Sequence, residues 1–150
     1  MSPVPTLARL ALAAGALLTV ACGSPAPTAR AAATPESVIA HLKAAGLPIS
    51  KPVIYTAETD TNKLLGRPNQ YTAKANWHDD RAPDGDDGTT VEIFATDADR
   101  KTRQDYVAAI AKTPIFAEYA YSRGLVLLRV SGKLTPDQAA EYERALQTLS

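Results

Sequence analysis

The sequence predicts an α+β fold, an antiparallel sheet of about five strands with helices packed on one face, which is a two-layer sandwich. Two segments in the middle of the chain alternate apolar and polar residues with the period of a half-buried strand. A Ser-Arg-Gly turn at 122–124 separates two further apolar runs, as in a β-hairpin. Helix-start signals occur at three places, and the short connections between strands favour antiparallel pairing.

The first expected elements are a helix and three strands. Thr34 and Pro35 are typical of a helix start, because a threonine hydroxyl caps free N–H groups and proline needs no hydrogen bond in the first turn. Gly46 is expected to end this helix. The other elements expected in this half are strands at 51–56, 71–78 and 89–95 and a single helical turn at 61–65.

A second helix is expected after these strands. Asp97 is placed as its N-cap, and the helix is expected to continue to about Lys112. The apolar spacing predicts that Tyr106, Val107 and Ile110 point inward.

A hairpin and a third helix complete the expected fold. The hairpin strands are expected at 115–121 and 125–130. Arg129 stands in an otherwise apolar strand, so it has to reach solvent or pair with an acid such as Glu118. Residues 135–138 read as a capping box that starts the last helix. That helix carries apolar residues at helical spacing: Ala139, Tyr142, Leu146 and Leu149.

The N-terminus has the features of a targeting segment. Arg9 precedes an uncharged, Ala/Leu-rich run at 10–20. That run is shorter than the roughly 20 residues that cross a bilayer, which favours the apolar region of a signal peptide over a transmembrane helix.

The run ends at Ala-Cys-Gly-Ser, which resembles the lipobox of bacterial lipoprotein signal peptides. The resemblance implies a signal peptide at 1–21 that is removed, and a diacylglyceryl group on the sulfur of Cys22 that anchors the chain to the extracytoplasmic face of the cell membrane. A plain secretory signal, with Cys22 incidental, is the alternative. Residues 22–33 would then be the lipidated cysteine and a Pro/Ala tether, and 34–150 a single α+β domain.

Composition excludes several classes of function. The chain has 16 basic and 16 acidic residues and no net charge, so we expect no nucleic-acid partner. Its one cysteine cannot form an internal disulfide or a multi-thiolate zinc site. No nucleophile elbow, H-E-x-x-H sequence or Gly-rich phosphate loop is present, so we expect neither catalysis nor a cofactor.

The densest set of metal-ligand residue types lies in one polar loop. Oxygen-rich loops bind divalent cations, but the spacing here is not that of an EF-hand, and a solvated turn is the alternative. The candidate metal residues are His78, Asp79, Asp80, Asp84 and Asp86.

A recognition surface is the other candidate site. The run LLGRPNQY at 64–71 resembles the L-G-x-P entry of small lipoproteins and inhibitors with the β-lactamase-inhibitor-like fold. The candidate binding residues, beside Tyr71 and Trp77, are Lys63, Arg67, Asn69 and Lys74. The alternative is that Gly66 and Pro68 only make a turn and Trp77 belongs to the core.

The folded region as a whole resembles a group of uncharacterised small lipoproteins and secreted proteins of high-GC Gram-positive bacteria. The resemblance rests on residues 62–75, 117–131 and 134–146 and supplies no site residues. The sequence thus predicts a lipid-anchored envelope protein that binds the membrane through its lipid and has a protein or cell-wall partner. A divalent-cation-binding protein or an enzyme-inhibitor-like lipoprotein is the alternative.

Overall fold

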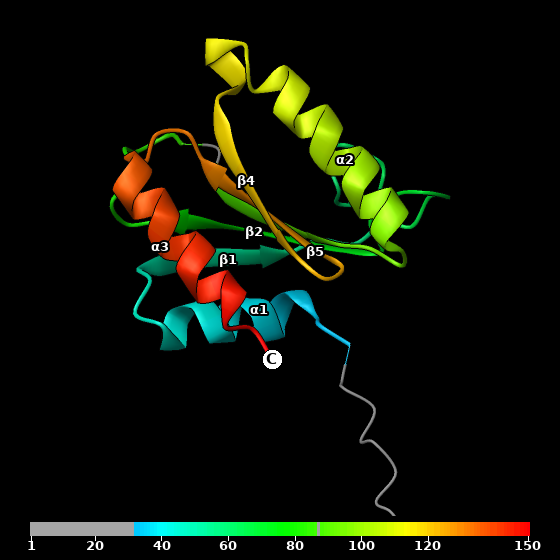
Figure 1. Cartoon of the computed structure of the whole chain (residues 1–150), viewed down its shortest axis with the longest axis horizontal. Coiled ribbons are helices and arrows are strands. Elements are labelled where there is room, and N and C mark those ends of the chain that lie inside the picture. Colours follow the sequence, from blue (N-terminus) through cyan, green and yellow to red (C-terminus); the bar gives the residue numbers. More distant parts are fainter. Residues whose placement is uncertain (1–31, 87) are drawn as a thin grey trace, which may run out of the picture. The chain divides into compact units, whose positions relative to one another are not determined.

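The elements follow one another as helix, three strands, helix and hairpin, with a third helix at the end (Figure 1). The computed structural model describes residues 32–86 and 88–150, which belong to one compact unit. The elements are α1 (Pro35–Ala44), β1 (Ile49–Ile54), β2 (Ala73–Asp79), β3 (Thr89–Ile93), α2 (Asp97–Ile110), the 3-10 helix η1 (Pro114–Phe116), β4 (Glu118–Arg123), β5 (Val126–Ser131) and α3 (Pro136–Gln147). Among the described residues, no helix is long and apolar enough to span a membrane.

All neighbouring strands of the sheet are antiparallel, in the order β1-β2-β3-β5-β4. The predicted α+β class and the antiparallel five-stranded sheet are therefore confirmed. The crossover from β3 to the β4–β5 hairpin runs through α2 and η1, and it places β5 rather than β4 beside β3.

The helices divide between the two faces of the sheet (Figure 1). The predicted packing of helices on one face holds for α1 and α3. Their apolar residues share one core with alternate residues of the strands. The opposite face carries α2, which reaches it through an ion pair between Arg103 and Glu92. The two-layer arrangement therefore holds for α1, α3 and the sheet, and α2 adds a partial third layer.

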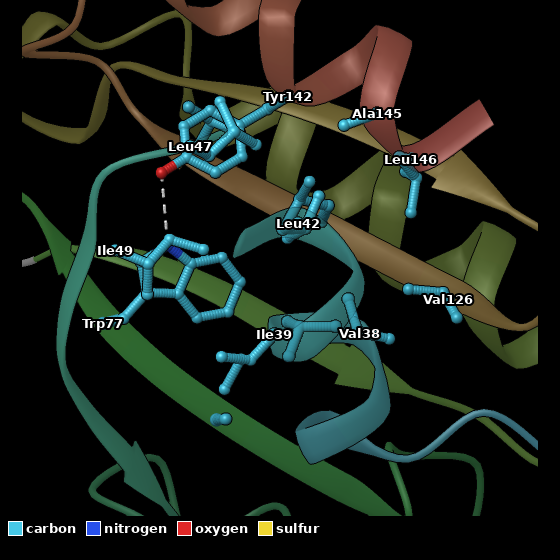
Figure 2. Packing of buried hydrophobic residues seen from close by; sticks show 14 of the residues in the cluster. Val38, Ile39, Leu42, Leu47, Ile49, Trp77, Val126, Tyr142, Ala145 and Leu146 are labelled. Carbon is cyan, nitrogen blue, oxygen red and sulfur yellow. Dashed lines mark hydrogen bonds between the residues drawn. The ribbon is translucent and has the colours of Figure 1, made fainter. Parts of the chain in front are cut away.

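The core between the sheet and α1 and α3 contains Trp77, the largest fully buried side chain among the described residues (Figure 2). Its indole N–H donates to the hydroxyl of Tyr142 at 3.3 Å, so the largest buried side chain also has its polar atom satisfied. Val38 and Leu42 of α1 and Leu146 of α3 have no exposed surface. All four apolar residues predicted for the last helix are buried.

Side-chain caps define where the helices begin. The expected capping box of α3 is present, with Thr135 and Gln138 bonding each other's backbone N–H groups. Helix α1 has a second capping box, in which Ser37 replaces the usual acid or amide. For α2 the expected N-cap, Asp97, is wrong by one residue, because the hydroxyl of Thr96 accepts from the Asp99 N–H.

Two strands lie at shifted positions. The strand expected at 51–56 begins two residues earlier, and its register with β2 shifts between Ser50 and Val53. The strand expected at 115–121 begins at Glu118, because residues before it form η1. Pro114 favours that turn, since proline fits the first turn of a helix and cannot donate to a ladder.

Candidate recognition cleft

The segment between β1 and β2 is folded around one buried carboxylate. Asp60 has no exposed surface. One of its oxygens accepts from the N–H groups of Leu64 and Leu65 at 3.0 and 3.1 Å and from the hydroxyl of Tyr71 at 2.8 Å. The other accepts from Lys74 Nζ at 2.8 Å. The side chain of Asp60 thus satisfies backbone N–H groups that have no partner in a helix or strand.

These hydrogen bonds lower the pKa of the Asp60 carboxyl group. Burial by itself raises the pKa of the Asp60 carboxyl, but the hydrogen bonds from Lys74, Tyr71 and the two backbone N–H groups outweigh it and hold that pKa well below its usual value. Burial and the bond to Asp60 raise the pKa of the Tyr71 hydroxyl. The helical turn expected at 61–65 is not formed, since its N–H groups bond this carboxylate instead.

The four candidate binding residues have different surroundings. Lys74 is buried in the ion pair just described, so it is part of the fold and not of a surface. Lys63 is exposed and donates to a carbonyl oxygen of its own loop at 2.5 Å. Arg67 is exposed in the same loop. Asn69, with a left-handed φ of 61°, lines a cleft.

That cleft lies between the loop at 64–70 and α2 and has a volume of about 300 Å³. Its wall carries two amides, a hydroxyl, a guanidinium, a phenol ring and one aliphatic chain, which suits both hydrogen bonding and stacking. The lining residues are Leu64, Asn69, Gln70, Thr102, Arg103 and Tyr106.

Arg103 fixes the α2 side of the cleft. Its Nε and one terminal nitrogen donate to the two oxygens of Glu92 at 3.0 and 2.9 Å, a two-bond geometry that sets the plane of the guanidinium. The guanidinium carbon lies 5.8 Å from the centroid of the Tyr71 ring and 5.5 Å from that of Tyr106. Both distances are within the range of a cation–π contact, which restrains Tyr106 although that residue is 56% exposed.

The positive charge of Arg103 belongs to a larger buried network. Glu92 has no exposed surface and also accepts from Arg129 at 3.0 Å. Arg129 in turn pairs with Glu118 at 3.0 Å, which confirms the pairing expected from the sequence. The charges of the two arginines are balanced by those of the two glutamates. The network therefore gives the cleft little net charge.

The cleft therefore presents an exposed aromatic ring beside amide groups. The sequence missed this arrangement because Tyr106 was expected to point inward with Val107 and Ile110. Of these, only Val107 is buried. The signal that reveals it is the polarity of the helix, since the run DADRKTRQD before Tyr106 leaves α2 too few apolar residues for a buried face.

The candidate metal residues are not brought together. His78 and Asp79 are neighbours in β2, so their side chains point to opposite faces of the sheet. Asp79 accepts from Arg81 at 2.8 and 3.0 Å and from the Tyr142 hydroxyl at 2.9 Å. Burial raises the pKa of the Asp79 carboxyl, but the bonds from Arg81 and Tyr142 lower it overall.

The other three candidate acids also have structural partners or stand in solvent. Asp80 accepts from the Ser50 hydroxyl at 2.5 Å, and Asp86 accepts from the Ser131 hydroxyl at 2.7 Å. Asp84 is exposed in a turn. Within residues 32–86 and 88–150, no three His, Cys, Asp or Glu side chains lie close enough to hold a metal ion.

The remaining candidate, Cys22, lies outside the described residues. Arg123, at the hairpin turn, donates to the carbonyl oxygens of Leu149, at 2.8 Å, and of Gln147, and so ties the hairpin to the end of α3.

No protein-family model, curated protein or solved structure matches this chain.

Proposed function

We propose that the chain is a lipid-anchored, extracytoplasmic binding module of the cell envelope, without a catalytic step, that recognises an envelope component through the cleft between the loop at 64–70 and α2. The anchor follows from the lipobox-like end of the N-terminal apolar run at Cys22. The Pro/Ala-rich residues 22–33 would hold the domain away from the bilayer surface.

The observation that carries the binding role is the fixed, exposed ring of Tyr106. An exposed aromatic ring in a polar cleft is useful for recognition, because it offers a large contact area with little side-chain entropy to lose. Arg103 and its bonds to Glu92 restrain that ring before any ligand arrives.

The chemistry of the lining indicates the kind of ligand. Asn69 and Gln70 offer amide donors and acceptors, and Tyr106 offers a flat apolar face. The one charged lining residue, Arg103, is neutralised by Glu92. An uncharged, hydrogen-bonding group with one apolar face is the ligand that this cleft favours over an ionic one.

Site-specific photo-crosslinking in cells tests the binding role. A photoreactive amino acid in place of Thr102, on the rim of the cleft, should capture a defined envelope component. The matched control replaces Glu143, which is exposed on α3, the helix against the other face of the sheet. Adding Tyr106→Ala to the Thr102 variant should reduce capture severalfold. Equal capture from both positions, or no effect of Tyr106→Ala, would contradict the proposal.

The anchor is tested separately by Cys22→Ser. This change removes the acylated sulfur, so the protein should be released to the medium or remain as uncut precursor. Fractionation and the size of the chain on a gel distinguish these results. A variant that stays membrane-bound at the mature size would show that the interpretation of Cys22 as a lipidation site is wrong. That result would not bear on the binding role proposed for the cleft.

A further inference from the structure

The two edges of the sheet differ in how well they are protected. At the β1 edge the register with β2 shifts between Ser50 and Val53. Lys51, inside that irregularity, has a left-handed φ of 49°, and Pro52 has no N–H to donate. Bulges, lysines and prolines on an edge strand all prevent another strand from pairing with it. The β1 edge is therefore closed to a further strand.

The β4 edge has none of these devices. All six residues of β4 pair with β5 in an unbroken register, from Glu118 opposite Ser131 to Arg123 opposite Val126. No proline, bulge or lysine interrupts the strand. An edge of this kind is a template on which another strand can form.

The hairpin turn shows which backbone groups of β4 face outward. The pair Arg123–Val126 closes a two-residue loop, and such a closing pair exchanges both of its backbone hydrogen bonds. Because bonding alternates along a strand, the N–H and C=O groups of Glu118, Ala120 and Ser122 point away from β5. The Ser122 carbonyl accepts from the Gln147 side chain at 3.3 Å, and the structure gives the outward groups of Ala120 no partner among the described residues.

Exposed apolar residues lie at both ends of β4. Ile115 and Phe116, just before the strand, are 81% and 57% exposed. Leu125, just after it, is 41% exposed. In an antiparallel pair of two β4 strands, the N-terminal end of each strand lies beside the C-terminal end of the other. Ile115 and Phe116 of one copy would therefore lie near Leu125 of the other and cover it. The apolar surface around β4 is in this sense self-complementary.

We infer that β4 (gold in Figure 1) is a homodimer interface, in which it pairs antiparallel with β4 of a second copy to make one sheet continuous across both. This inference does not rest on the proposed function. It uses only the sheet edge and the residues at its two ends.

One register satisfies the outward groups best. With Ala120 opposite Ala120 of the second copy, the outward groups of Glu118, Ala120 and Ser122 face one another on the two strands, and the Ser122 carbonyl would exchange its bond from the Gln147 side chain for one across the interface. Tyr119 then lies opposite Tyr121 of the second copy, a favourable cross-strand aromatic pair. Glu118 lies opposite Ser122 of the second copy, so like charges do not face each other directly.

Disulfide cross-linking tests this register. In a full-length Cys22→Ser chain, which has no native thiol, Ala120→Cys should oxidise rapidly to a disulfide-linked dimer, because Cα atoms of such a pair are about 5.5 Å apart, within disulfide range. The matched control is Ser122→Cys, whose two copies would lie four residues apart along the strands, roughly 13 Å. Ser122→Cys should cross-link far less. Equal or greater cross-linking of Ser122→Cys would overturn the inferred register.

A proline variant tests the interface independently. Ala120→Pro removes an outward N–H and leaves the bonds of β4 to β5 in place, so the fold should persist while dimerisation weakens roughly tenfold or more. Tyr121→Pro is the comparison, since it removes a bond to β5 and should unfold the domain. Sedimentation and circular dichroism of the full-length chain give both readouts. A wild-type chain that stays monomeric at high concentration, or an Ala120→Pro chain that dimerises as well as wild type, would overturn the inference.

Discussion

The two faces of the sheet are stabilised in different ways. The face under α1 and α3 has the larger apolar core, with Trp77 and Tyr142 packed among aliphatic side chains that have almost no exposed surface. The face under α2 has a smaller apolar cluster together with ionised side chains, and only Val107 of that helix is buried. The charged residues of this face are Lys74, Glu92, Glu118 and Arg129.

This difference explains how each helix is held. Apolar burial is non-directional, so α1 and α3 are fixed by the shape of the core. The position of α2 combines the burial of Val107 with the Arg103–Glu92 pair, whose geometry is directional. Tyr106 stands on this second helix. The cleft wall is thus set by ion pairs, which position a side chain without covering it.

The largest expected loss comes from the apolar face. Trp77→Ala removes the central side chain and should lower the free energy of unfolding by about 3–5 kcal/mol, because lost burial and a cavity add together. Chemical denaturation of the variant and the wild type measures the difference. A loss below about 1 kcal/mol would show that the core is not centred on this residue.

The charged face is tested next, by Glu92→Gln. The change leaves two cations facing a neutral amide, so the free energy of unfolding should fall by about 3 kcal/mol. Glu118→Gln is the matched control, since Glu118 is partly exposed and pairs with Arg129 alone, and its loss should be clearly smaller. Equal losses in denaturation would mean that burial of the network has no energetic weight.

A smaller effect is expected from acidification. The pKa of Asp60 is lower in the folded chain than its unfolded value of about 3.9. Its contribution to stability is complete above that value and is lost as the pH falls below it toward the folded pKa. Denaturation between pH 6 and pH 2 should show this decline, and Asp60→Asn, although less stable at neutral pH, should show a flatter one. An unchanged slope would contradict the assignment.

The smallest effect is expected on the outer side of α2. Lys101 and Asp105 form an exposed ion pair at 3.0 Å. Lys101→Ala should change the free energy of unfolding by no more than about 0.5 kcal/mol, because solvent screens the pair. A loss as large as that of Glu92→Gln would remove the distinction between the buried Arg103–Glu92 pair and the exposed Lys101–Asp105 pair.

Local signals in the sequence predicted most of the fold. The capping box at Thr135 and the helical spacing of Tyr142 and Leu146 placed α3 correctly, and Thr34 and Pro35 placed α1. The hairpin itself was predicted, but its turn falls at residues 124–125 and not at 122–124, because Ser122 and Arg123 pair with β5. These elements depend on neighbours within a few residues, so a single sequence carries enough information to find them.

The candidate site was predicted less well. Lys74 was assigned to a surface but is buried in an ion pair with Asp60. The prediction failed because Asp60 lies in the segment before β2, and residue spacing does not reveal such a pair. Asn69 was assigned to the site and does line the cleft. Tyr106 and Arg103 were missed as site residues, since the other wall of the cleft depends on which face of the sheet α2 covers.

The sequence by itself determined the class of fold, the capped helices and the apolar strand residues, because capping and alternation are short-range effects. The tertiary structure decided which face received α2, where the charges at Glu92 and Arg129 found partners, and that β4 would form an unprotected edge. These features join residues far apart in the chain. A charge in a strand can be buried only where another element brings its partner, and the order of the strands decides which edge is left open.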